Sequence, residues 1–65
     1  MEALKIVFNK IQNEYAMTEP NDIKLDVLFE LFAELLMANN ILFDIDSLDA
    51  HILNFDTVED YISNL

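Results

Sequence analysis

The absence of glycine is the feature that most constrains how this chain folds. Its 65 residues include no glycine and a single proline, Pro20. Tight hairpin turns, and the loops that hold phosphates or dinucleotides, need residues that accept a positive φ or a close approach of the backbone, which glycine does best. We therefore predict an all-α protein, with one small domain over residues 1–65.

The stability of so short a chain has to come from a dense core, because cysteine is absent and no disulfide or thiolate metal site can form. Apolar residues make up 54% of the chain, which is enough for tightly packed helices and leaves room for self-association. The lack of cysteine fits a cytoplasmic protein.

The charge of the chain is strongly one-sided, with a net charge of −10 from 13 acidic residues against Lys5, Lys10 and Lys24. Such a surface repels the phosphates of nucleic acids and anionic membranes, and it attracts basic patches on proteins. The apolar run at 25–38 is interrupted by acids and is shorter than the roughly 20 residues of a membrane span. The start of the chain also lacks the pattern of a signal peptide. We expect a soluble, cytoplasmic protein with a basic protein partner, and neither nucleic acid nor membrane as partner.

Helical spacing of apolar residues predicts a first helix at 2–16 and a second at 24–39, separated by a loop around Pro20. In the second helix Asp26, Glu30 and Glu34 stand four residues apart and form one acidic stripe, while nearly every other position is apolar. Such a helix must be covered on most sides. We favour cover by the other helices, with an apolar face kept for a partner as the alternative.

The last third of the chain predicts two shorter helices. An apolar linker at 41–45 is expected to enter the core, and a short helix at 47–53 follows. The final helix is predicted at 57–65, with Asp56 as its N-cap and Glu59 three residues on. Tyr61 is expected at the edge of the core with its hydroxyl in water. The four helices would form a small bundle around the long second helix.

The order of these helices and three stretches of sequence resemble the acyl and peptidyl carrier proteins. "NDIKLDVLFEL" looks like the loop that leads into the carrier site, "ELLMANNILFDI" like the second half of the acidic second helix, and "FDTVEDYISNL" like the last helix. The resemblance implies a carrier-like four-helix fold that docks on biosynthetic enzymes through its acidic second helix. The residues that would do so here are Asp26, Glu30 and Glu34.

The attachment site of the family, an Asp-Ser-Leu at the start of the second helix, is missing in this register. Compared with the usual length of the family, about a dozen residues are missing there. A competing register places Asp46-Ser47-Leu48 at that site, and Ser47 would then carry 4'-phosphopantetheine. Only 18 residues follow Ser47, however, which is short for the rest of a carrier fold. Ser47 is therefore either a modified residue or a simple helix-start residue, and we favour the second.

Catalytic and metal sites are not expected. Asp44, Asp46 and Asp49, with Asp56 beyond, could suggest calcium. The glycine of an EF-hand loop is absent, however, and Ile45 and Leu48 interrupt the acids. Ser47 and His51 stand at i, i+4 but lack an oxyanion pocket, and the carboxylates of one helix edge cannot flank a substrate cleft. We expect a protein that is not an enzyme.

Three functional hypotheses remain. The first is a carrier-like docking module, with or without the phosphopantetheine arm. The second is an acidic helical inhibitor that mimics nucleic acid, such as a phage-encoded blocker of a nuclease. The third is a structural homo-oligomer that buries apolar surface of the second helix between chains. The identity of the partner distinguishes the first two, and concentration-dependent helicity would support the third.

Overall fold

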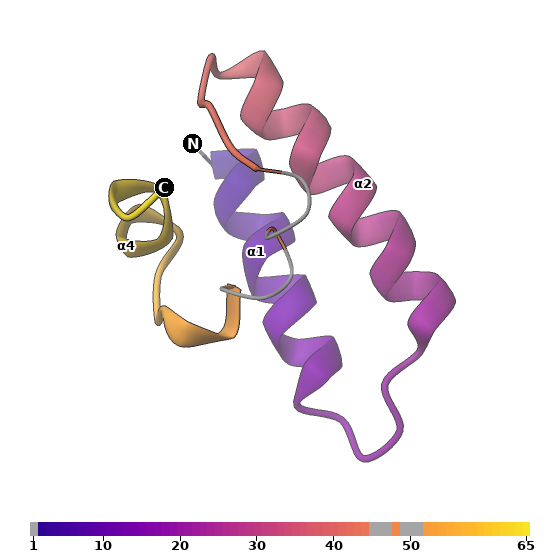
Figure 1. The fold of residues 1–65 in the computed structure, drawn as a ribbon. Helices are drawn as coiled ribbons and strands as arrows, with labels where there is room; N and C mark the ends of the chain where they lie inside the picture. The colour runs from indigo at the N-terminus through magenta and orange to yellow at the C-terminus, as the bar shows by residue number, and fades with distance from the viewer. Residues whose placement is uncertain (1, 45–47, 49–51) are drawn as a thin grey trace.

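The computed structural model describes residues 2–44, 48 and 52–65, which are mostly helical with no β-strand among them (Figure 1). This confirms the prediction of an all-α protein. The elements are α1 (Glu2–Tyr15), α2 (Asp22–Ala38), the short 3-10 helix η2 (Ile52–Asn54) and α4 (Val58–Ser63). The predicted third helix at 47–53 lies mostly outside the described residues, and its described end is the single turn η2. The four-helix bundle therefore stays a prediction.

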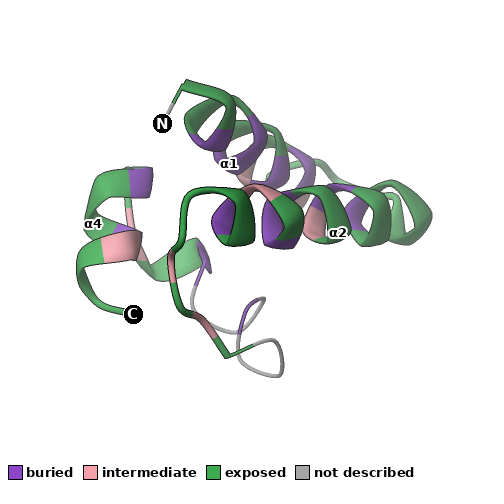
Figure 2. Cartoon of the chain, turned by 90° about the horizontal axis from the view of Figure 1, so that it is seen from above, coloured by how far each residue is buried: buried purple, intermediate pink, exposed green. Residues whose placement is uncertain are grey.

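The two long helices run antiparallel, and α1 also contacts η2 and α4 (Figure 1). Buried and exposed residues alternate along both helices, as expected for helices that are covered on one side (Figure 2). The side chains that are almost fully buried come from every described element: Leu4, Phe8, Ile11, Phe32, Leu36, Ile52, Val58 and Tyr61.

Aromatic rings hold the centre of this core. The ring centroid of Tyr61 lies 5.9 Å from that of Phe8, 5.6 Å from that of Phe32 and 5.9 Å from that of Phe55. Such tilted and edge-on contacts are favourable for aromatic pairs. The expectation that the Tyr61 hydroxyl reaches water is wrong: the residue is 1% exposed, and the hydroxyl donates to the carbonyl of Leu48 at 3.5 Å. Burial raises the pKa of Tyr61 because its charged form would lose hydration.

The start of α2 lies two residues before its predicted start at Lys24. Asn21 is the N-cap, and its side-chain oxygen accepts a hydrogen bond from the backbone N–H of Lys24 at 3.0 Å. Pro20 precedes this cap, so its restriction on the preceding residue falls in the loop and leaves the first turn of α2 free to form.

α2 ends in a C-cap that is formed without glycine. Asn39 is the C-cap, and Asn40 has a positive φ of 59°. Ile41 donates its N–H to the carbonyl of Leu36 and Asn40 donates to that of Met37, both at 3.0 Å. These two bonds form a Schellman motif, in which asparagine takes the left-handed position that glycine usually fills.

The cap of the last helix differs from the prediction of Asp56 as N-cap. Thr57 has an extended backbone, with φ −129° and ψ 156°, and its hydroxyl oxygen accepts from the N–H of Asp60 at 3.2 Å. Thr57 is therefore the N-cap and α4 begins at Val58. The acid three residues on is Asp60, not Glu59, because the cap lies one residue later than the sequence pattern suggested.

Candidate docking surface

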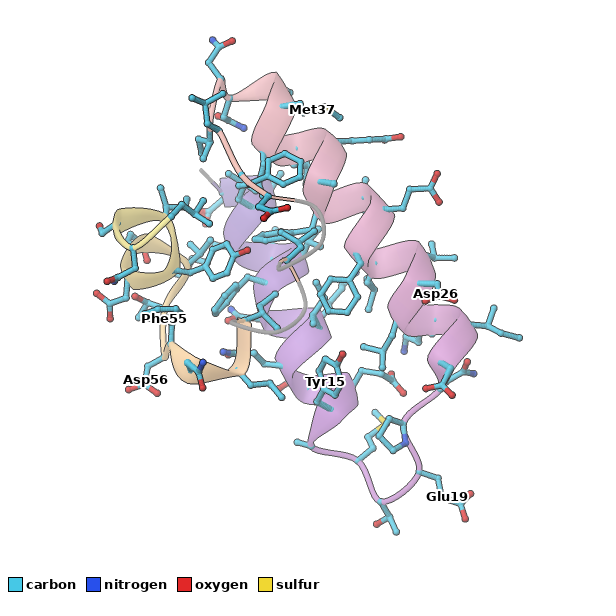
Figure 3. All side chains as sticks on the ribbon, in the orientation of Figure 1. Tyr15, Glu19, Asp26, Met37, Phe55 and Asp56 are labelled. Carbon is cyan, nitrogen blue, oxygen red and sulfur yellow. The ribbon has the colours of Figure 1, made fainter. Side chains whose placement is uncertain are left out.

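The acidic stripe predicted from the sequence lies on the outer side of α2. Asp26, Glu30 and Glu34 are all exposed, and successive members are about 6 Å apart along the helix axis because each residue rises about 1.5 Å. Figure 3 shows Asp26 on α2, outside the core side chains that fill the space toward α1. We call these three residues the acidic row.

Among the described residues, no cation neutralises the carboxylates of the acidic row. Within the described part of the chain, none of the three takes part in an ion pair or a side-chain hydrogen bond. Lys5 and Lys10 lie exposed on α1, and the ammonium of Lys24 lies 3.3 Å from Glu14. The charge of the acidic row is therefore available to a partner.

A second row of side chains lies beside the acidic row on the outer side of α2. Ile23 is 78% exposed, Val27 60% and Leu31 42%, and we call these residues the apolar row. Each stands three residues before a member of the acidic row, and residues at i and i+3 are neighbours on a helix surface. The outer side of α2 therefore presents aliphatic groups and carboxylates together.

The exposure of the apolar row corrects our preference for a second helix that the rest of the domain covers. Among the described residues, the buried side chains of α2 are Leu25, Leu28, Phe32, Ala33 and Leu36. They lie on the side of the helix opposite to the apolar row, since each residue turns by about 100°. α1 makes most of the contacts with α2, and one packed helix covers only one side of another.

The other flank of the acidic row holds a shallow, open groove of about 490 Å³. Its lining is mostly apolar and comes from the end of α2 and the linker that follows: Ala33, Met37, Ile41, Leu42, Phe43 and Asp44. The linker enters the core only in part, because Ile41 and Phe43 pack against it while Leu42 is 91% exposed.

The burial of one carboxylate, that of Glu14, was not predicted from the sequence. Glu14 is 3% exposed, accepts a hydrogen bond from the backbone N–H of Asn21 at 2.9 Å, and pairs with Lys24 at 3.3 Å. The hydrogen bond from Asn21, helped by the Lys24 ammonium, lowers the pKa of Glu14 despite its burial. One sequence signal pointed to it: Glu14 follows Ile11 by three residues and thus continues the apolar face of α1. Its role is to tie the loop between the helices to the start of α2.

Gln12 is a second polar group that joins distant parts of the chain. Its side-chain amide donates to the carbonyl of Phe55 at 2.6 Å and to that of Ile52 at 3.3 Å. Spacing alone places Gln12 among the polar residues of the first helix, and no local pattern indicates its partners, which are some 40 residues away. The contact holds the η2 segment against α1.

The remaining predicted site residues lie outside the described part of the chain. Ser47, the candidate attachment residue, is among them, and so are Asp46, Asp49 and His51. In the ranges that the structure does describe, no group of three or more acidic or histidine side chains is arranged to hold a metal ion. No helix within those ranges is long and apolar enough to cross a membrane.

Comparisons with models of protein families, with curated proteins and with solved structures gave no match to this chain. The outer side of α2 is therefore the feature on which a functional conclusion has to rest.

Proposed function

We propose that this protein is a small acidic docking module, which binds a basic patch on a partner protein through the acidic row of α2 and does no chemistry by itself. The observation that supports this is the row of three exposed carboxylates, Asp26, Glu30 and Glu34, without an internal cation among the described residues. Carrier proteins, which the sequence resembles, present the same kind of surface to biosynthetic enzymes.

Electrostatics favours such a role for physical reasons. A net charge of −10 on 65 residues produces a long-range attraction toward basic surfaces, which speeds encounter. The acidic row then orients the partner during the encounter, because its charges repeat every helical turn on one side of the molecule. Salt screens exposed charges over about 8 Å at physiological ionic strength, so binding should weaken as salt is added.

Neutralising the acidic row tests the proposal. The triple variant Asp26→Asn, Glu30→Gln and Glu34→Gln is expected to lose the partner in affinity capture followed by mass spectrometry. We expect binding to weaken by roughly fivefold to 150-fold, since each exposed interfacial ion pair contributes a few tenths to 1 kcal/mol and three are lost.

The matched control carries the same change in charge elsewhere on the surface. Glu19→Gln, Asp56→Asn and Glu59→Gln remove three exposed acids away from α2 and should leave capture intact. Equal loss with both triples would show that net charge alone attracts the partner, and retention by both would refute a role of α2. A nuclease as the captured protein would favour the nucleic-acid mimic, and a synthase or ligase would favour the carrier-like module.

The carrier resemblance leaves two forms of this proposal, a carrier with 4'-phosphopantetheine on Ser47 and a degenerate carrier without the arm. We favour the degenerate form because, in the register that fits the three resembling stretches, the family's Asp-Ser-Leu is missing from the start of the second helix. After incubation with coenzyme A and a promiscuous phosphopantetheinyl transferase, the intact mass is expected to stay unchanged. A gain of one phosphopantetheine that Ser47→Ala abolishes would instead establish a working carrier.

A further inference from the structure

We infer that the partner segment that docks on α2 is itself a basic amphipathic helix. Its aliphatic side chains would lie on the apolar row of Ile23, Val27 and Leu31, and its Lys or Arg side chains would meet the acidic row. The inference rests on the docking role proposed above and adds the shape and chemistry of the partner.

The spacing of the two rows determines which kind of segment fits. Both rows repeat every four residues, which is about 6 Å along the axis, and the two are offset by three residues. A helix carries two such rows side by side on one face, because residues at i, i+3 and i+4 are neighbours. An extended strand cannot do so, since its adjacent side chains point to opposite faces. A helix with aliphatic and basic residues each repeated every four positions matches the surface.

The exposure of the apolar row explains why charge alone does not describe this surface. Val27 and Leu31 are 60% and 42% exposed, and Ile23 at 78% extends the same row by one turn. A contiguous aliphatic patch beside charged residues is typical of an interaction surface. A basic partner without aliphatic side chains would leave this patch in water.

A second copy of the chain is a poor occupant of the same surface. Pairing α2 with α2 would place the carboxylates of one acidic row next to those of the other, in chains that each carry a net charge of −10. The chain has only three lysines to offset this, and Lys24 is already paired with Glu14. A different, basic partner removes the repulsion and supplies the opposite charge.

Binding of designed peptides tests the inference. The probe is a fluorescein-labelled peptide of about 14 residues, made of Leu, Lys and Ala, with Leu and Lys each repeated every four positions. A scrambled peptide of identical composition is the reference. At low salt, fluorescence polarisation should give a Kd at least about tenfold lower for the amphipathic peptide than for the scrambled one.

Variants of exposed residues locate the contact. Val27→Ser and Leu31→Ser should each weaken binding of the amphipathic peptide by about fivefold or more, since each removes an aliphatic side chain whose burial at the contact favours binding. Met37→Ser is the matched control, because Met37 is 59% exposed, as Val27 is 60%, but lies in the groove on the other flank of the acidic row. Its effect should stay within about twofold.

Several outcomes would overturn the inference. Equal binding of both peptides, lost in the acidic-row triple variant, would leave the docking function standing and refute the helical partner. A loss with Met37→Ser as large as with Val27→Ser would move the contact to the groove. A wild-type dimer in sedimentation that Val27→Ser dissociates would show that a second copy covers the row. If neither peptide binds, and if both triple variants still capture the partner protein, the docking function is refuted as well.

Discussion

Replacing Phe32 with alanine is expected to remove most of the stability of the domain. Phe32 is fully buried, and its ring centroid lies 6.2 Å from that of Phe8 and 5.6 Å from that of Tyr61, so the side chain joins α2 to both α1 and α4. Truncation of a buried phenylalanine costs about 3–5 kcal/mol, through lost burial and the cavity that remains.

That loss is large compared with the free energy of unfolding of the whole domain. A domain of 65 residues is stabilised by roughly 3–10 kcal/mol, at about 0.05–0.15 kcal/mol per residue. Urea denaturation followed by circular dichroism should therefore show a much lower unfolding midpoint for Phe32→Ala than for the wild type. The effect is sharper here than in a large protein, because a small domain has few other core contacts to compensate.

The adjacent residue provides the control. Leu31 belongs to the same turn of α2 but is 42% exposed, so Leu31→Ala should change the free energy of unfolding by less than about 1 kcal/mol. A similar loss in both variants would contradict the assignment of Phe32 to the core and of Leu31 to the outer surface. Leu31→Ala also provides a folded protein in which the docking surface alone is altered.

The carboxylate of Glu14 is expected to make the protein sensitive to acid. Its pKa in the folded state lies below the ordinary value of 4.5, because the N–H of Asn21 and the ammonium of Lys24 favour the charged form. As the pH falls, the unfolded chain therefore takes up this proton first. The stabilisation is present above about pH 4.5 and is lost as the pH falls through the lower folded-state pKa.

A variant separates the contribution of Glu14 from that of the other 12 acidic residues. The measurement is the free energy of unfolding from urea denaturation between pH 7 and pH 3. Glu14→Gln should be less stable than the wild type at pH 7, and the difference should shrink toward pH 3.

The matched control is Glu34→Gln, which removes the same kind of group from an exposed position on α2. Its stability should follow that of the wild type or lie slightly above it at pH 7, because one repulsive charge is gone. A constant difference between Glu14→Gln and the wild type across the whole pH range would mean that Glu14 acts through packing and not through its charge.

Parts of the candidate site follow from the sequence alone. Asp26, Glu30 and Glu34 had to share one side of a helix as soon as a helix formed there, because four residues make slightly more than one turn. Part of the apolar row was visible too, because Val27 and Leu31 stand four residues apart in the predicted helix, although Ile23 lies before its predicted start at 24. Its exposure was not, since periodicity shows which residues are neighbours on a helix and says nothing about what packs against them.

The N-caps of the helices also depend on tertiary contacts that the sequence pattern does not show. Asn21 and Thr57 are both good N-cap residue types, yet the sequence pattern placed the start of the second helix at 24 and the cap of the last helix at Asp56. Several polar residues stand near each helix start, and the one that caps is the one whose backbone leaves the helix. That choice depends on how the loop is held, and at α2 the loop is held by Glu14 of another helix.

Local spacing and composition were sufficient for the all-α class, the two long helices and the acidic row, because these depend on residues within a few turns of each other. Only the tertiary structure decided which side of α2 stays open, where Glu14 and Gln12 find partners, and that Tyr61 lies inside. These features depend on contacts between residues that are distant in the chain. Such contacts come from the packing of whole helices, which no local pattern specifies.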